Sequence, residues 1–159
     1  MDSVDDRRTP SELFLPLHRE FDFTVDVASS EENFLLPRHY TKDDNGLDRS
    51  WESERVWCNP PYSNLYPWVR KAHEEVRSTV VMLLPANRTE QPFWQEYIEP
   101  WRDKGMRLST RFVKGRTKFY NPENKKTGGS PFACVVCVWV PIDREPTRDE
   151  IAQFLKGSK

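Results

Sequence analysis

A short apolar run that stops at two prolines is the feature that most constrains this chain of 159 residues. The run Arg-Val-Trp-Cys at 55–58 is followed at once by Asn-Pro-Pro-Tyr-Ser at 59–63. β-Branched and aromatic residues favour a strand, whereas proline has a fixed φ and no N–H to donate to a sheet. We therefore predict a strand over 55–58 that presents a stiff loop, 59–63, at its carboxyl end.

The loop offers groups that suit one chemical task, the grip of a planar group that carries an NH2. Asn59 supplies a side-chain oxygen acceptor, Pro60 a backbone carbonyl and Tyr62 a flat ring. The lone pair of a base amine is delocalised into the ring, and two acceptors on its hydrogens would free it to attack an electrophilic methyl group. We predict Asn59, Pro60 and Tyr62 as catalytic residues. The alternative is an ordinary Pro-Pro turn after a strand.

The chain resembles the phage-type DNA N6-adenine methyltransferase family. Asn-Pro-Pro-Tyr is similar to the catalytic motif of S-adenosylmethionine-dependent amino-methyltransferases, and the likeness extends from Thr-Pro at 9–10 through Phe-Thr-Val-Asp at 23–26 to Gly-Arg-Thr-Lys-Phe at 115–119. The resemblance implies a site-specific, adenine-specific DNA methyltransferase. Such an enzyme moves a methyl group from S-adenosylmethionine to the N6 amine of an adenine flipped out of double-stranded DNA, and the family's expected purpose is protection from host nucleases.

The order of predicted elements indicates an α/β fold. Strand-like runs at 21–27, 55–58 and 79–84 alternate with helical segments, which is typical of a parallel sheet. The run at 79–84 is continuously apolar, as in a strand buried on both faces. Two further strand-like runs, 106–113 and 132–140, are separated by a polar loop over 114–130. Together with the resemblance, this order predicts a Rossmann-like class I methyltransferase sheet, partly parallel, with a C-terminal antiparallel pair.

Helix starts and apolar faces follow from capping rules and periodicity. Thr9 and Glu12 fit a capping box with Pro10 at the first helical position, and Pro67 begins another helix. The residues predicted to face the core of the later helices are Trp68, Val69, Ala72, Val76, Phe93, Trp94, Tyr97 and Ile98.

Length predicts one domain over 1–159, with its core at about 9–141 and a short terminal helix at 147–156. The resemblance implies that this domain is a methyltransferase. Three cysteines favour a reducing compartment, and neither a signal peptide nor a membrane-length apolar run is visible. We expect a cytoplasmic monomer or weak dimer. The resemblance implies a phage or prophage gene expressed in a bacterial host cell.

Cofactor contacts are predicted near the first strand. Asp26 ends that strand, where open α/β sheets bind ligands, and Asp44 falls about 20 residues further on, where an acid commonly binds ribose hydroxyls. Ala28 is small enough for close approach in place of the usual glycine. The alternatives are a solvated acid at 26 and a local acidic turn at 44. The resemblance implies that Thr9 and Pro10 hold the methionine end of the cofactor. Asn59 is also predicted to contact the cofactor. For Thr9, the alternative is a plain helix cap.

A basic segment resolves the problem that a net charge of −1 gives no overall attraction to DNA. Between 107 and 126 seven basic residues face one acid, with Phe112, Phe119 and Tyr120 among them. Basic groups for phosphates and rings for bases are typical of nucleic-acid binding, although a solubilising loop is the alternative. The resemblance implies that Phe119 packs on the second face of the flipped base, opposite Tyr62. The predicted DNA contacts are Pro61, Ser63, Lys114, Arg116, Lys118 and Phe119.

No metal site is expected. Cys134 and Cys137 are spaced like half of a zinc site, but residues three apart in a strand point to opposite faces, and no further ligands complete a set of four.

Two other functions stay open at this point. The same fold acts on other planar amines, in an RNA base or a protein glutamine, and a catalytically silent nucleic-acid-binding module would keep the fold only. Binding of labelled S-adenosylmethionine would separate the last of these from an enzyme.

Overall fold

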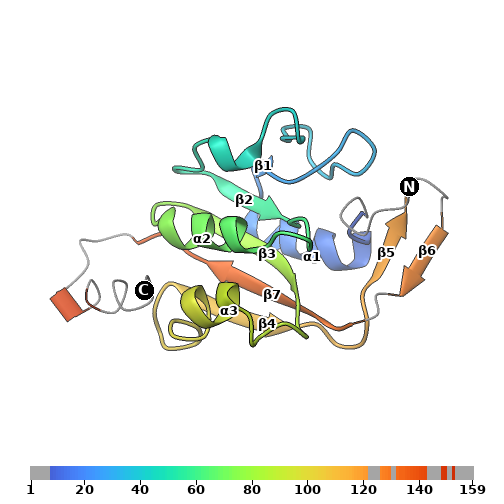
Figure 1. The fold of residues 1–159 in the computed structure, drawn as a ribbon. Helices are drawn as coiled ribbons and strands as arrows, with labels where there is room; N and C mark the ends of the chain where they lie inside the picture. Colours follow the sequence, from blue (N-terminus) through green and yellow to red (C-terminus); the bar gives the residue numbers. More distant parts are fainter. Residues whose placement is uncertain (1–7, 122–125, 130–131, 143–147, 150–151, 153–159) are drawn as a thin grey trace.

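A computed structural model of the chain describes residues 8–121, 126–129, 132–142, 148–149 and 152. Its main sheet has five strands in the order β1-β2-β3-β7-β4 (Figure 1). The strands β1 (Val25–Asp26), β2 (Arg55–Cys58) and β3 (Thr79–Pro85) are parallel. Strand β7 (Cys134–Trp139) lies antiparallel between β3 and β4 (Leu108–Phe112). The predicted α/β class, with a partly parallel sheet and an antiparallel pair, is confirmed.

The first strand is shorter than the run predicted over 21–27, because only Val25 and Asp26 pair with β2. A second segment extends the sheet at this edge: the Asp26 N–H donates to the Arg38 carbonyl at 3.1 Å, and the Tyr40 N–H donates to the Asp26 carbonyl at 2.8 Å. The chain after β1 is thereby fixed beside the strand's carboxyl end.

Helices cover both faces of the sheet, as Figure 1 shows. Helix α1 (Ser11–Phe21) packs Phe14 and Leu17 on one face, where Val81 and Leu83 of β3 point. Helices α2 (Tyr66–Glu74) and α3 (Pro92–Tyr97) cover the other face. Because successive strand residues alternate between faces, β3 is buried on both sides, as predicted.

The predicted core residues of α2 and α3 are buried, with one exception. Val76 is 36% exposed, because α2 ends at Glu74 and the residue lies beyond the helical face.

The predicted capping box at the start of α1 is wrong. The N-cap is Pro10, which makes no side-chain cap, and its carbonyl accepts from the N–H groups of Leu13 and Phe14, both at 3.1 Å. Thr9 precedes the cap, and its hydroxyl accepts from the Asn59 amide nitrogen in place of a helix N–H.

The segment predicted as a polar loop, 114–130, contains an antiparallel pair of strands, β5 (Lys118–Asn121) and β6 (Lys126–Gly129). The pair stands apart from the main sheet (Figure 1). It is attached to the core through Phe119, which is 5% exposed.

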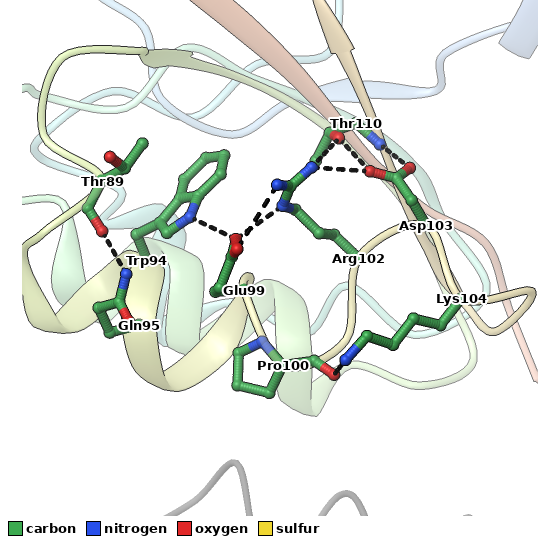
Figure 2. Close-up of polar contacts among 9 residues, drawn as sticks. All are labelled: Thr89, Trp94, Gln95, Glu99, Pro100, Arg102, Asp103, Lys104 and Thr110. Carbon is green, nitrogen blue, oxygen red and sulfur yellow. Dashed lines mark hydrogen bonds and ion pairs between the residues drawn. The ribbon is translucent and has the colours of Figure 1, made fainter.

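A polar network ties α3 to β4 (Figure 2). The Trp94 indole N–H donates to Glu99 at 3.0 Å, and Arg102 donates to Glu99 at 2.7 Å and to Asp103 at 3.1 Å. Asp103 in turn accepts from the Thr110 N–H of β4 at 2.8 Å. These contacts fix the turn that leads into the outer strand.

Cys134 and Cys137 join different core clusters on opposite faces of the sheet, so the prediction that their sulfurs diverge is confirmed. Within the described ranges, no helix has the length and apolar character needed to cross a membrane. The predicted terminal helix at 147–156 falls almost wholly outside the described residues.

Candidate active site

The loop after β2 is joined to the start of the described chain by one side-chain contact. The Asn59 amide nitrogen, Nδ2, donates to the Thr9 hydroxyl at 3.3 Å, and Thr9 is buried. Two residues that the sequence assigned to the site for separate reasons are therefore neighbours. With its nitrogen engaged by Thr9, the amide keeps Oδ1 as an acceptor for another group.

Tyr62 lies beneath the loop as a buried ring. Its hydroxyl donates to the Leu83 carbonyl at 3.2 Å, and burial raises the pKa of that hydroxyl well above its usual value. Its ring meets Phe119 edge to face, with centroids 6.5 Å apart and planes at 87°, and it also contacts Phe132.

The structure thus brings Tyr62 and Phe119 together, but not as the two parallel faces of a sandwich. The bond to the Leu83 carbonyl explains the difference, because it turns the Tyr62 ring inward. The stacking roles of both rings stay predictions.

A cleft of about 590 Å³ lies beyond the carboxyl ends of β1 and β2. Its walls come from residues 27–33, 40–43 and 45–46, and Asn59, Pro61 and Trp68 close the remaining side. Of the predicted cofactor residues, Ala28 and Asn59 line this cleft. Pro61, which was predicted to contact DNA, lines it as well.

Asp26 supports this cleft from beneath and is not part of its lining. Its carboxylate accepts from the backbone N–H of Ala28 at 3.4 Å and from that of Leu35 at 3.1 Å. The side chain is buried, and this burial raises its pKa to about 7 against the opposing effect of the two hydrogen bonds. The carboxylate therefore fixes both ends of the loop that forms one wall.

Asp44 does not line the cleft but forms a hydrogen bond with a residue that does. Its carboxylate accepts from the Thr41 N–H at 2.9 Å, and this bond is the main cause that lowers the pKa of Asp44. The geometry is that of the local acidic turn. Thr41 itself lines the cleft, so Asp44 holds a lining residue in place.

Gly46 is a residue of the cleft that the sequence did not single out. A Cβ at this position would lie 2.1 Å from the Val27 carbonyl oxygen, so only glycine permits this approach to β1. The Gly46 carbonyl accepts from the buried Trp51 indole N–H at 3.0 Å. The Asn-Gly pair at 45–46 was the available signal, but it predicted only a polar turn.

Two of the seven basic residues counted between 107 and 126 bind groups of the protein itself. Arg107 is buried and donates to five backbone carbonyls, and burial lowers its pKa to about 10. Arg111 forms a two-pronged ion pair with Glu20, at 2.7 Å for each bond. Lys114, Arg116 and Lys118 are exposed, so the basic surface next to Phe119 remains.

Arg88 is a second residue that the sequence did not mark. Its guanidinium donates to the Tyr62 carbonyl at 2.5 Å and lies over the Phe132 ring, 5.8 Å from the centroid. It therefore braces the loop after β2 from the segment that follows β3.

Comparison with solved structures supports the fold. The chain is similar to a proposed RNA methyltransferase from Pyrococcus horikoshii, with a TM-score of 0.52 and 12% identity. The match covers 85% of this chain and 83% of that one. At this identity the likeness shows the fold alone.

Comparison with curated sequences gives two phage proteins named DNA N-6-adenine-methyltransferase. The protein of Escherichia phage T1 is 36% identical over 85 residues, which is 51% of this chain and 36% of the phage protein. That of Haemophilus phage HP1 is 37% identical over 65 residues, which is 39% of this chain and 38% of the phage protein. The matched part is thus under two-fifths of either relative. The profile of the DNA N-6-adenine-methyltransferase (Dam) family matches residues 1–153, so the chain belongs to that family.

Proposed function

We propose that the protein transfers a methyl group from S-adenosylmethionine to the N6 amine of an adenine in DNA. The observation that carries this proposal is the position of Asn59, which borders the cleft while its amide nitrogen is held by Thr9. The amide oxygen is then an acceptor at the rim of a pocket large enough for a cofactor. Membership of the family supports the choice of adenine and DNA.

The cleft fits S-adenosylmethionine in size and in chemistry. A volume of about 590 Å³ is within the range of small-molecule sites. Three lining acids, Glu31, Glu32 and Asp43, suit a donor with a sulfonium and an ammonium group. The rings of Tyr40 and Trp68 offer flat surfaces for an adenine. Once bound, the cofactor supplies the electrophilic methyl group.

The chain's own contribution is to hold and polarise the target amine. The Asn59 side-chain oxygen and the Pro60 carbonyl accept its two hydrogens, which favours the tetrahedral nitrogen that attacks. As the nitrogen–methyl bond forms, the methyl–sulfur bond of the cofactor would break, positive charge grows on the nitrogen, and both acceptors stabilise it. The methylated amine would then release one proton to water. An adenine inside a duplex is out of reach, so the base is flipped out toward Tyr62 and Phe119.

The exposed side chains of Lys114, Arg116 and Lys118 would bind DNA phosphates. They lie on and just before β5, whose Phe119 contacts Tyr62. Phosphate contacts there would position the duplex over the loop that carries Pro61 and Ser63. Thr9, Pro10, Asp26, Ala28 and Asp44 would serve the cofactor directly or through the walls of its cleft.

The test is to incubate the protein with methyl-labelled S-adenosylmethionine and unmethylated duplex DNA, then to digest the DNA to nucleosides and separate them. Label in N6-methyldeoxyadenosine is the expected result. Label that appears only when RNA or protein is offered would overturn the substrate and keep the reaction. No transfer to any of the three would favour the silent binding module.

The variant Asn59→Ala tests the central residue. Methyl transfer should fall on the order of a hundredfold or more, as when other enzymes lose one group that stabilises transition-state charge. Cofactor affinity should change much less. Asn87→Ala, an exposed asparagine outside the cleft, is the matched control. Near-normal turnover of the Asn59 variant would contradict its role.

A further inference from the structure

A second cavity, of about 560 Å³, lies on the other side of the loop after β2. One wall is formed by residues 62–66, which follow β2, and the other by residues from 88 to 93, which follow β3. The two cavities share no lining residue: Asn59 and Pro61 border the first, and Tyr62 borders the second. Ligands commonly bind at the carboxyl ends of neighbouring parallel strands, so the position of this cavity is typical of a ligand site.

The chemistry of this cavity suits a nucleotide. Arg88 is its charged side chain, the half-buried Tyr66 supplies aromatic surface, and the buried Phe93 forms part of its base. A guanidinium carries five N–H donors, and within the described part of the chain Arg88 uses one of them, for the Tyr62 carbonyl. The remaining donors match the oxygens of a phosphate.

Two amide side chains complete the cavity. Asn64 and Gln91 are exposed lining residues, one from each wall. Gln91 is the N-cap residue of α3 but makes no side-chain cap, and the described residues give neither amide a side-chain partner. Asparagine and glutamine amides can each donate and accept at once, as base edges require.

We propose that this cavity binds a nucleotide next to the target adenine in the same DNA. Arg88 holds a phosphate of that nucleotide, while Asn64 and Gln91 read the edge of its base and so set sequence preference beside the methylated site. The proposal rests on the proposed function, because it needs DNA as the substrate. A protein segment with a carboxylate is the competing occupant, and the tests below separate the two.

The first test follows sequence preference. A pool of duplexes with random bases around one adenine is methylated, and the methylated products are sequenced. The wild-type protein should prefer one base at a flanking position. Asn64→Ala or Gln91→Ala should relax this preference between about fivefold and a hundredfold, with cofactor affinity unchanged.

Gln95→Ala is the matched control. Gln95 lies one turn further along α3 and donates to the Thr89 carbonyl at 2.7 Å (Figure 2). Neither Gln95 nor Thr89 lines the cavity. Its preference should equal that of the wild type. A preference that survives in both Asn64→Ala and Gln91→Ala would overturn the proposal, as would wild-type methylation of DNA without any flanking preference. A wild-type protein that methylates no DNA would instead overturn the proposed function.

The second test separates a phosphate contact from a purely structural role of Arg88. DNA affinity is measured against salt concentration for the wild type and for Arg88→Gln. Loss of one phosphate contact should reduce the slope of log affinity against log salt by about one. Arg70→Gln, an exposed arginine on α2 that pairs with Glu74, should keep the wild-type slope. An unchanged slope for Arg88→Gln would assign Arg88 to the support of Tyr62 alone and overturn the phosphate contact.

Discussion

The Asn59 amide nitrogen donates to the Thr9 hydroxyl at 3.3 Å, across a sequence separation of fifty residues. The bond connects the segment before α1 with the loop that follows β2. It also decides which end of the amide is offered to a substrate, because the engaged nitrogen leaves the oxygen as the acceptor. We therefore expect Thr9 to act on the proposed reaction through Asn59.

The variant Thr9→Val removes this bond and keeps the shape of the side chain. The Asn59 amide could then rotate, so methyl transfer should fall between about threefold and tenfold, in line with the net value of one hydrogen bond. Cofactor affinity, measured by calorimetry, should stay near that of the wild type. Thr79→Val, at the first position of β3, is a control with the same change of side chain. If cofactor affinity falls as much as turnover, Thr9 contacts the cofactor, as the family resemblance implies.

Patterns that depend on neighbours in the chain predicted the fold well. The continuous apolar run of β3 predicted that this strand is buried on both faces. The prolines after Cys58 predicted the end of β2 and the loop that follows it. Each of these features follows from backbone preferences or from the alternation of faces along a strand. They need no knowledge of what lies across the sheet.

Features set by distant partners were missed or misjudged. Arginine usually lies on the surface, but the Arg107 side chain is buried. It can be buried because it donates hydrogen bonds to backbone carbonyls near the end of α2 and after β7. The β5–β6 pair went unrecognised because its charged and glycine-containing sequence lacks the alternation of a half-buried strand. The Asn-Gly pair at 45–46 indicated only a turn, because the close approach of Gly46 to Val27 is a tertiary contact.

Gly46→Ala should deform the cleft that we propose for the cofactor. The added methyl would lie 2.1 Å from the Val27 carbonyl oxygen, so the segment must move away from β1. We expect a loss of stability of about 1–3 kcal/mol, which is typical of overpacking, together with weaker binding of S-adenosylmethionine. Thermal unfolding and calorimetry measure the two effects.

Gly105→Ala is the matched control for that variant. Gly105 has a φ of 72°, and among the described residues no atom lies within 4 Å of the place that an added methyl would take. Alanine there costs backbone strain of about 1 kcal/mol without a clash. Cofactor affinity should then be unchanged. Equal affinity losses in the two variants would show that the Gly46 effect reflects stability and not the shape of the cleft.

Variants of Arg107 and Arg116 should differ in effect: the first should lower the stability of the fold and the second should weaken DNA binding. Arg107→Met leaves several buried carbonyls without a donor, including those of Ala72 and Ser78, and should destabilise the fold by about 3–5 kcal/mol. Arg116→Gln changes an exposed residue, so it should weaken DNA binding and leave the unfolding midpoint unchanged. Chemical denaturation and DNA titration measure these outcomes. A stable Arg107 variant with weakened DNA binding would restore Arg107 to the DNA-binding surface.

Asp26 should titrate near neutral pH. Burial raises its pKa from 3.8 to about 7, so the folded chain keeps the proton over a range in which the unfolded chain has lost it. The stability that Asp26 contributes is therefore fully present below about pH 4 and is lost as the pH rises through 7. His73 acts in the opposite sense, because burial lowers its pKa to about 4 and its contribution is lost as the pH falls from 6.5.

Because these two effects offset one another, global stability is a poor measure of either, and the Asp26 carboxyl must be followed by itself. Carbon-13 NMR of its carboxyl carbon, assigned by its absence in Asp26→Asn, should show a midpoint near pH 7. Addition of S-adenosylmethionine should lower that midpoint if the cofactor's ammonium approaches the carboxylate, because a nearby cation favours the charged form. A midpoint near pH 4 in the free protein would contradict the buried position of Asp26 under the cleft.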